Sequence, residues 1–299
     1  MAVRTHLARA ARQVGVAVSA SGGHPFDDLA RLPVVDDDHY AWVVARHALA
    51  ARRLMALGLH VHVGVRTEAV LLGATAALRR WVAPLVAMSA NSPFSMGVDT
   101  GFDSYRQVAI GALPRTGFPP AFETLEEVRD YIDRMTATGD IARPGDLWWS
   151  VRPNVPLGTV EVRACDLPTE PWRVAALVGV IRGLVAYWQN GIERGERPPA
   201  MAEHYLEQNL WSARRFGLEG RIVDPATRET LPMREQARRM IARAAEGNDI
   251  LDDPWPTATE AERLLAKGNE ASWQRRRLKE LDGDLRALEL EVVGRSMRS

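Results

Sequence analysis

The sequence predicts an α+β fold, in which helices are segregated around an antiparallel sheet and pack on one of its faces. Two strand-like segments, residues 146–154 (DLWWSVRPN) and 158–166 (GTVEVRACD), are joined by the tight connection VPLG, which is typical of antiparallel neighbours. A third alternating segment, residues 60–65 (HVHVGV), lies between two helical patterns. Helical patterns dominate the chain from residue 171 onward, and neither a repeat nor a low-complexity tract interrupts them.

The first ninety residues alternate helices with short strands. An amphipathic helix over residues 2–14 leads into a strand over 14–20 (VGVAVSA) and then into a turn. Helical periodicity over residues 40–58 ends at Gly58, where a glycine is expected as a C-terminal cap. A second helix, over residues 68–88, contains Pro84, which should bend or break it.

Residues 89–120 are rich in Gly, Pro, Ser, Asn and Asp. A loop of this length in a compact domain is usually functional or disordered, and its aromatic residues, Arg106 and Arg115 favour a functional loop. The next helix covers residues 122–139, with Thr124 as its N-cap and a glycine past its end. Residues 171–193 predict a long apolar helix.

Composition limits the classes of function. The 299 residues are 46% hydrophobic and 25% charged, and we expect one domain over residues 1–299 that includes a helical, arginine-rich part over 200–299. The formal net charge of zero argues against nucleic acid or an anionic membrane as a partner. No apolar run approaches the roughly 20 residues that span a bilayer. Because Cys165 is the only cysteine, no intramolecular disulfide can form, and we expect the reducing cytoplasm.

Two histidines in the HVHVGV segment are candidate ligands. Side chains alternate along a strand, so His60 and His62 should project to one face while the valines project to the other. Paired imidazoles on one face can hold a metal or contact a phosphate. The alternative is a strand that is simply wet on one side, and the motif alone leaves both interpretations open.

The GTVEVRACD segment offers a second candidate. Strict alternation places Thr159, Glu161, Arg163 and Cys165 on one face. A carboxylate beside a guanidinium can hold Mg²⁺ through the acid and a phosphoryl group through the arginine, and Arg152 joins them if the two strands pair. An exposed Glu/Arg pair of little energetic weight is the alternative.

Other reactive or aromatic residues predict structural roles. Cys165 has no histidine near it in the sequence, so a buried structural cysteine is expected. Tryptophans at 148, 149 and 211 are expected in the core.

Several motifs in order resemble the bacterial glutamate–cysteine ligase type 2 family of carboxylate–amine ligases, over about His24 to Arg277. They are GLHVHVGV, MSANSPFSMGVDTGFDSYR, LPRTGFP, LWWSVRPN, GTVEVRACD, NLWSARRFGLEG and KGNEASWQRRR. The resemblance implies a glutamine synthetase-like catalytic fold. It also implies an ATP-dependent reaction, in which the γ-carboxylate of glutamate is phosphorylated and an amine, such as cysteine, attacks the acyl phosphate.

The resemblance also implies roles for individual residues. His60 and Glu161 would bind divalent metal, Mg²⁺ being the cofactor beside ATP, and His62 would contact nucleotide phosphates. Arg163 and Arg152 would stabilise the transferring phosphoryl group. Two loop arginines, Arg106 and Arg115, are candidates for the substrate carboxylates or the nucleotide. Such roles suit phosphoryl transfer, which depends on positioning and charge neutralisation more than on a nucleophilic side chain.

One departure from the family pattern concerns the start of the chain. The family begins with strands that include one of the type Gly-Val-Glu-Glu-Glu-Phe, whose carboxylates hold the catalytic metals, and we expect this chain to start after them, before SASGGHPFDD. A misassigned initiation codon, a degenerate homologue without ligase activity, and a partner chain that supplies the strands are the explanations, in that order. The rival to an enzyme is therefore a non-catalytic remnant that binds a nucleotide or amino acid, or a subunit of a split ligase. The tail from Arg234 onward either packs on the catalytic sheet or makes a subunit contact, as in a homo-oligomer.

Overall fold

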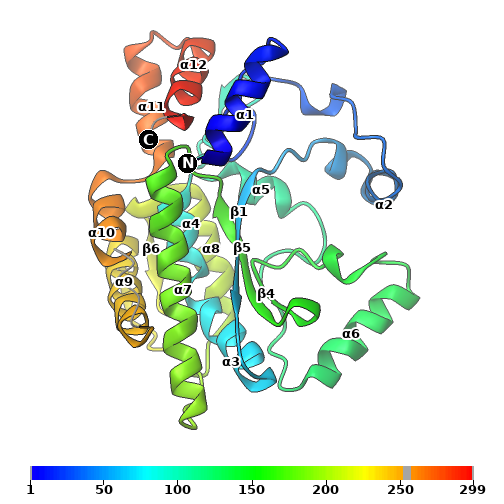
Figure 1. Cartoon of the computed structure of the whole chain (residues 1–299), viewed down its shortest axis with the longest axis vertical. Coiled ribbons are helices and arrows are strands. Elements are labelled where there is room, and N and C mark those ends of the chain that lie inside the picture. Colours follow the sequence, from blue (N-terminus) through cyan, green and yellow to red (C-terminus); the bar gives the residue numbers. More distant parts are fainter. Residues whose placement is uncertain (1, 252–256, 298–299) are drawn as a thin grey trace.

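The computed structural model describes residues 2–251 and 257–297, and a three-stranded antiparallel sheet lies at its centre (Figure 1). The strands are β1 (Gly58–Gly64), β4 (Val151–Asn154) and β5 (Thr159–Asp166), in the order β1-β5-β4. Helices α3 (Glu68–Leu78), α4 (Val82–Ser89) and α7 (Pro171–Glu193) pack against one face of this sheet. The fold is therefore α+β, with its main helical layer on one face, as predicted.

The remaining helices surround this core. Helices α2 (Asp38–Arg52) and α6 (Leu125–Ala137) lie on the other side of the sheet from α7 (Figure 1). The other helices are α1 (Ala2–Gln13), α5 (Tyr105–Ile110), α8 (Glu203–Phe216), α9 (Met233–Ile250), α10 (Thr257–Lys267), α11 (Glu270–Glu280) and α12 (Leu285–Ser296). Two small hairpins pair β2 (Phe94–Ser95) with β3 (Val98–Asp99) and β6 (Arg221–Val223) with β7 (Thr230–Pro232).

Several predicted elements are found at their predicted places. The helix predicted over 171–193 has those bounds, and Thr124 caps α6 by accepting a hydrogen bond from the amide of Glu127. The helix predicted over 68–88 is interrupted by a 3₁₀ turn, Arg79–Trp81, just before Pro84. Because a proline cannot donate to the carbonyl one turn earlier, the break falls where the α-helical bond to Arg80 would be lost.

Two predictions about the first sixty residues are wrong. Residues 14–20 are not a strand: the segment runs against α12, and the amide of Ala20 bonds to the hydroxyl of Ser296 instead of to a neighbouring strand. Gly58 is not a helix cap, because α2 ends at Arg52 and Gly58 begins β1. Both errors arise because local periodicity cannot show which distant segment a backbone pairs with.

The predicted long loop over 89–120 contains structure of its own. The β2/β3 hairpin and helix α5 both lie inside it. Its start is tied to the end of β5, because the carboxylate of Asp166 accepts hydrogen bonds from the amide of Asn91 and from the hydroxyls of Ser92 and Ser104. These bonds satisfy a fully buried carboxylate and hold the loop against the sheet.

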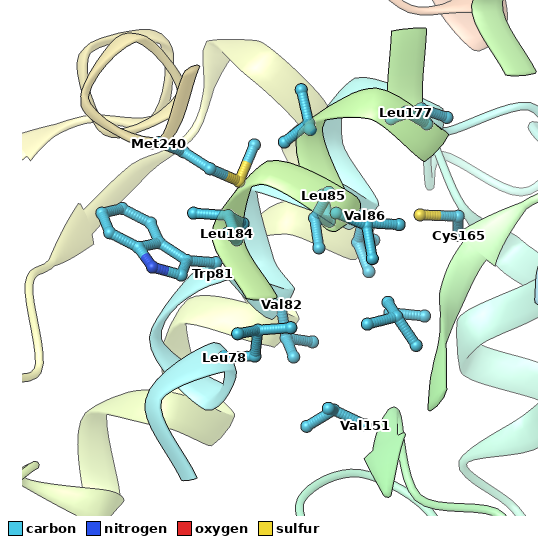
Figure 2. Packing of buried hydrophobic residues seen from close by; sticks show 14 of the residues in the cluster. Leu78, Trp81, Val82, Leu85, Val86, Val151, Cys165, Leu177, Leu184 and Met240 are labelled. Atoms are coloured by element: carbon cyan, nitrogen blue, oxygen red, sulfur yellow. The ribbon is translucent and has the colours of Figure 1, made fainter. Parts of the chain in front are cut away.

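A bulge in β5 changes which residues share a face. Leu59 of β1 pairs with Cys165 and Val61 pairs with Val162, so β5 has one more residue than β1 over this interval. The bulge reverses the alternation at the end of the strand, and Cys165 enters the core (Figure 2) instead of sharing the polar face with Glu161 as predicted. Burial raises the pKa of the Cys165 thiol to about 12, which agrees with the predicted structural role.

The core lies between the sheet and the helical layer (Figure 2). Segment Glu68–Ser89 is long and apolar enough to span a membrane by length and composition, contrary to the expectation from the sequence. In the structure 78% of its apolar window is buried, as α3 and α4 fill the centre of the core. Large side chains there include Leu78, Trp81, Leu85, Leu177, Leu184 and Met240.

The arginine-rich tail packs on the helical layer instead of directly on the sheet. Helices α9 and α10 contact α7 and each other. Helices α7 and α9 approach so closely that a Cβ at Gly183 would meet the carbonyl oxygen of Ala244, and a Cβ at Gly247 would meet the carbonyl oxygen of Gly183. Glycine at both positions therefore sets the distance between these helices.

We expect Gly183→Ala to lower the free energy of unfolding by about 1–3 kcal/mol, because the steric conflict with α9 outweighs the better helix propensity of alanine. Gly294→Ala is the matched control, since a Cβ at this helical glycine of α12 meets nothing within 4 Å. It should raise the unfolding free energy by up to about 1 kcal/mol. Urea titrations measure the unfolding free energy of both variants. If both variants were more stable than the wild type, this would contradict the close approach of α7 and α9.

Candidate functional site

The open face of the sheet carries a cluster of charged side chains centred on Glu161. The strand register places His62, Glu161 and Arg152 directly opposite one another across β1, β5 and β4. The carboxylate of Glu161 accepts hydrogen bonds from Arg152 Nε at 2.6 Å, from Arg163 Nη1 at 2.5 Å and from Asn154 Nδ2 at 3.2 Å. His62 Nε2 lies 3.4 Å from the same carboxylate. The predicted meeting of Arg152 with the GTVEVRACD strand is thus confirmed.

The electrostatics of this cluster favour an ionised Glu161. The side chain is only 1% exposed, and burial alone would raise its pKa. The hydrogen bonds and positive charges of Arg152 and Arg163 outweigh burial and lower the pKa to about 2. One carboxylate therefore faces two guanidinium groups, and the surface keeps an excess of positive charge.

The two histidines lie on the predicted face but in different surroundings. His60 Nδ1 lies 3.2 Å from Arg163 Nη1, which can donate to it. Burial, and then the charges of Arg163 and Arg106, lower the pKa of His60 to about 4, so its ring is neutral at neutral pH. His62 Nδ1 lies 3.0 Å from the hydroxyl of Thr159. Both rings are thus tied to the cluster.

Arg106 reaches the cluster from beneath. It projects from α5, is 3% exposed, and donates to the carbonyls of Ala164 and Arg163 at 3.2 Å each. The carboxylate of Asp166 lies 3.6 Å from the guanidinium of Arg106. The Nε atom of Arg106 is buried without a hydrogen-bond partner. Asp166 is not among the residues predicted for this region, although it ends the GTVEVRACD motif.

Arg115 is not part of the cluster. Its backbone has a positive φ of 58°, and its Nη2 donates to the carbonyl of Asp140 at 2.6 Å. It does not line any of the cavities that border the cluster. The structure thus brings together six of the seven predicted site residues and leaves Arg115 apart.

Cavities border the open face on the side where α2 and α6 lie. The first, of about 170 Å³, is lined by residues that include His60, Arg106 and Arg163. The second, of about 410 Å³, lies beneath α2 and also reaches Arg163. The third, of about 520 Å³, lies between α6 and β4 and reaches Arg152. The cluster is therefore accessible to small ligands from more than one direction.

Adjacent tryptophans separate these cavities. Trp148 lines the first and second cavities, whereas Trp149 lines the third. Trp149 is buried as predicted, Trp148 is half-buried at the cavity walls, and Trp211 is 45% exposed, contrary to prediction. The pair Trp148 and Trp149 could have indicated cavity walls in the sequence. The prediction that both lie in the core did not include this role.

The side chains of the cluster do not by themselves make a site for Mg²⁺. Both oxygens of Glu161 already accept hydrogen bonds from arginine, and His60 faces a guanidinium. Within residues 2–251 and 257–297, no group of three His, Cys, Asp or Glu residues is placed to hold a metal ion. Magnesium requires near-octahedral coordination, mostly by oxygen, so these residues alone do not fit it.

A cavity with apolar walls and a few convergent polar side chains is the usual form of a small-molecule site in proteins. The family model for glutamate–cysteine ligase family 2 matches residues 1–291, and the chain belongs to that family. The predicted resemblance is thereby confirmed, and at the level of the family the protein is a ligase.

Relatives with the name "putative glutamate–cysteine ligase 2" support this membership. One from Gloeobacter violaceus is 33% identical over 273 residues, which are 91% of this chain and 73% of the relative. Another, from Methylibium petroleiphilum, is 34% identical over 277 residues, which are 91% of this chain and 73% of the relative. A third, from Rubrobacter xylanophilus and numbered 2-3, is 36% identical over 242 residues, or 81% of this chain and 65% of the relative.

Gly58 makes room for Arg106, because a Cβ there would meet the guanidinium group. We expect Gly58→Ala to lower the free energy of unfolding by about 1–3 kcal/mol, since the buried arginine must move and lose hydrogen bonds. Gly64→Ala in the same strand is the control, because its Cβ meets nothing within 4 Å. Chemical denaturation distinguishes them, and equal stability of the two variants would contradict this role of Gly58.

Glu161 should stabilise the fold in a pH-dependent way. Its pKa of about 2 in the folded protein lies below the ordinary 4.5, so its stabilisation is present above pH 4.5 and is lost as the pH falls toward 2. We expect Glu161→Gln to lower the unfolding free energy by about 2–3 kcal/mol at pH 7, because two guanidinium groups lose their counter-ion. Urea titrations at pH 7, 5 and 3.5 should show that the difference in unfolding free energy between the wild type and Glu161→Gln narrows as the pH falls. A difference that stays constant would contradict the lowered pKa of Glu161.

Proposed function

We propose that this protein is an ATP-dependent carboxylate–amine ligase that forms a γ-glutamyl amide. The γ-phosphoryl group of ATP passes to the γ-carboxylate of glutamate, and ADP leaves. The nitrogen of an amine, such as that of cysteine, then attacks the acyl carbon, phosphate leaves, and the amine loses a proton. The observation that carries the proposal is the pair of guanidinium groups, Arg152 and Arg163, held on an accessible sheet face by one carboxylate.

This arrangement suits phosphoryl and acyl-phosphate chemistry. Charge builds on oxygen atoms in both steps, and fixed positive groups stabilise it without a nucleophilic side chain. We assign Arg163 and Arg152 to this role. Arg163 lines the first two cavities, so it can contact a carboxylate bound there, and Arg152 lines the third.

The other predicted roles differ in the contacts that support them. His62 is assigned to nucleotide phosphates, because its half-exposed ring lies beside the arginine cluster. Arg106 borders the first cavity with its buried guanidinium and is assigned to the substrate carboxylate. The family also implies His60 and Glu161 as metal ligands, but we derive no step through a metal because these side chains are engaged with arginine. The role of Arg115 in contacting the substrate carboxylates or the nucleotide is supported only by the resemblance to the family.

The setting of the reaction follows from the same proposal. The substrates are small molecules, and the composition favours neither nucleic acid nor an anionic membrane as a partner. We place the protein in the cytoplasm, where a lone cysteine would stay reduced. In this proposal the chain acts as one domain over residues 1–299, and any assembly that it forms is a homo-oligomer.

A second candidate function is a non-catalytic homologue that binds a nucleotide or an amino acid, either alone or as a subunit of a split ligase. The engagement of both Glu161 oxygens with arginine favours it, because a ligase of this family would use that carboxylate for metal. The two candidates differ in turnover and not in the presence of a ligand site.

To test the ligase, the purified chain is incubated with Mg-ATP, glutamate and a mixture of amino acids, and ADP and γ-glutamyl products are followed by mass spectrometry. We expect product from the wild type and at least about a 100-fold lower rate from Arg163→Gln, because a fixed donor to the developing charge is lost. Arg238→Gln, at an exposed arginine of α9 that pairs with Glu235, should leave the rate unchanged.

Each outcome distinguishes the two candidates. Product that disappears only in Arg163→Gln supports the ligase with this arginine in its site. An unchanged rate in Arg163→Gln contradicts the assignment of the site. Binding of ATP or glutamate by calorimetry, with no product from any amino acid, favours the non-catalytic homologue.

A further inference from the structure

We propose that a basic cavity among the carboxyl-terminal helices binds a small organic molecule that carries a phosphate monoester group. The cavity has a volume of about 790 Å³ and lies where the amino-terminal end of α7 meets the end of α10 and the helices α11 and α12. The proposal goes beyond the proposed function and does not rest on it. We call this site the α11 cavity and define it by Lys267, Trp273, Arg276, Arg277, Gly294 and Arg295.

The α11 cavity is separate from the charged sheet face. None of the described residues that line it lines any of the three cavities beside the Glu161 cluster. Helix α10 lies on the side of α7 that faces away from the sheet, and α11 and α12 lie beyond the amino-terminal end of α7 (Figure 1). The KGNEASWQRRR segment supplies four residues that the proposed function does not use, Lys267, Trp273, Arg276 and Arg277.

Basic side chains outnumber acidic ones in the walls of the α11 cavity. The acidic residues are Glu170 and Glu291. The amino-terminal end of the long helix α7 adds partial positive charge, and its N-cap makes no side-chain cap bond. The cavity therefore attracts anions. Its basic residues are Arg173, Lys267, Arg276, Arg277 and Arg295.

The two carboxylates hold three of these arginines in place. Glu170 accepts a hydrogen bond from Nε of Arg173 at 3.2 Å and lies 2.9 Å from Nη2 of Arg295. Glu291 accepts two hydrogen bonds from Arg277, from Nε at 2.7 Å and from Nη2 at 2.6 Å. These arginines are therefore positioned before a ligand arrives, and both acidic groups in the walls are already engaged.

Lys267 and Arg276 are the positive charges that no carboxylate balances. Among the described residues neither forms an ion pair, and the ammonium group of Lys267 lies 5.9 Å from the ring centre of Trp172. Nη1 of Arg295, also in the described part of the chain, is buried without a hydrogen-bond partner. A phosphate monoester carries about −1.5 to −2 charges at neutral pH. One such group balances the two unpaired cations, whereas one carboxylate does not.

The α11 cavity also has room for the organic part of the ligand. Trp273 is half-buried, and the guanidinium of Arg295 covers its ring at 3.7 Å from the ring centre. Leu290 lines the cavity and is 70% exposed. A Cβ at Gly294 would meet nothing within 4 Å, so the wall that α12 forms is open at this point. The cavity therefore suits a compound larger than inorganic phosphate.

The test uses the only two lysines of the chain, Lys267 and Lys279. Both are exposed, but Lys279 does not line the α11 cavity and therefore serves as the reference. The full chain is treated with pyridoxal 5′-phosphate, whose aldehyde condenses with a lysine amine to an imine with loss of water. Borohydride then reduces the imine, and peptide mass spectrometry measures the label on each lysine. Pyridoxal, which has no phosphate, is the matched control reagent.

We expect pyridoxal phosphate to label Lys267 at least about tenfold faster than Lys279, because its phosphate binds beside Lys267. Pyridoxal should label the two lysines at rates within about threefold of each other, since it lacks this charge. Inorganic phosphate should slow the labelling of Lys267 alone. The same preference with both reagents, or no preference with either, overturns the proposal.

Citrate distinguishes a phosphate site from a site for any multivalent anion. At the same ionic strength, we expect citrate to protect Lys267 less than inorganic phosphate does. Equal protection by the two anions overturns the assignment to a phosphate group.

Two variants test the walls of the α11 cavity. Arg276→Gln removes one unpaired charge, and Gly294→Glu places a carboxylate in the open wall; both positions are exposed, so both variants should fold. We expect each to reduce the preference of pyridoxal phosphate for Lys267 to within about threefold. Arg238→Gln, at an exposed arginine of α9 that pairs with Glu235, is the control and should keep the preference. A preference that persists in either cavity variant overturns the proposal.

The labelling also separates this inference from the proposed function. Arg163→Gln should leave the labelling of Lys267 unchanged, because Arg163 does not line the α11 cavity. A preference that disappears in Arg163→Gln assigns the phosphate to the sheet face and overturns the proposal. Phosphate-dependent labelling in a chain that forms no γ-glutamyl product keeps the α11 cavity and rejects the ligase. Product formation with equal labelling of both lysines does the reverse.

Discussion

The interaction on which the rest of the site depends is the bond of one buried carboxylate, Glu161, to two guanidinium groups. Removing a carboxylate from water is unfavourable unless charged hydrogen bonds replace the solvent, and Arg152 and Arg163 provide them. The partners come from two strands, so the pairing of β4 with β5 must be in register before the carboxylate is satisfied. A shift by one residue would turn Glu161 into the apolar core. The charged row therefore selects the register that also brings the proposed site residues together on one face.

The bulge in β5 connects this face to the segment that follows the core helices. It turns Cys165 inward and allows Asp166 to collect hydrogen bonds from residues 91, 92 and 104. Those bonds hold α5 in position, and α5 places Arg106 under the sheet. A glycine at 58 provides the space that the guanidinium needs. Positioning of the site thus relies on an irregular strand and on one missing side chain, in addition to the regular ladder.

The two faces of the sheet have different surroundings: one is buried in the core and the other borders the cavities. Helices α3, α4 and α7 bury one face in a continuous apolar core, which stabilises the strands (Figure 2). The opposite face carries the charged cluster around the buried Glu161, and α2 and α6 lie on that side (Figure 1). Cavities border the cluster there. Membership of glutamate–cysteine ligase family 2 implies small-molecule substrates, which agrees with the presence of these cavities. The helical layer thus stabilises the sheet from one side and leaves the charged cluster on the other.

The sequence by itself determined the α+β class, the long helix over 171–193, the capped helix α6 and the polar face of His60, His62, Glu161 and Arg163. These features depend on alternation, periodicity and capping within a few residues. Only the tertiary structure decided that residues 14–20 lie against α12, that Gly58 accommodates Arg106, that Cys165 faces the core and that Arg115 lies apart. Each depends on a contact with a distant segment, and local patterns contain no information on which segment that is.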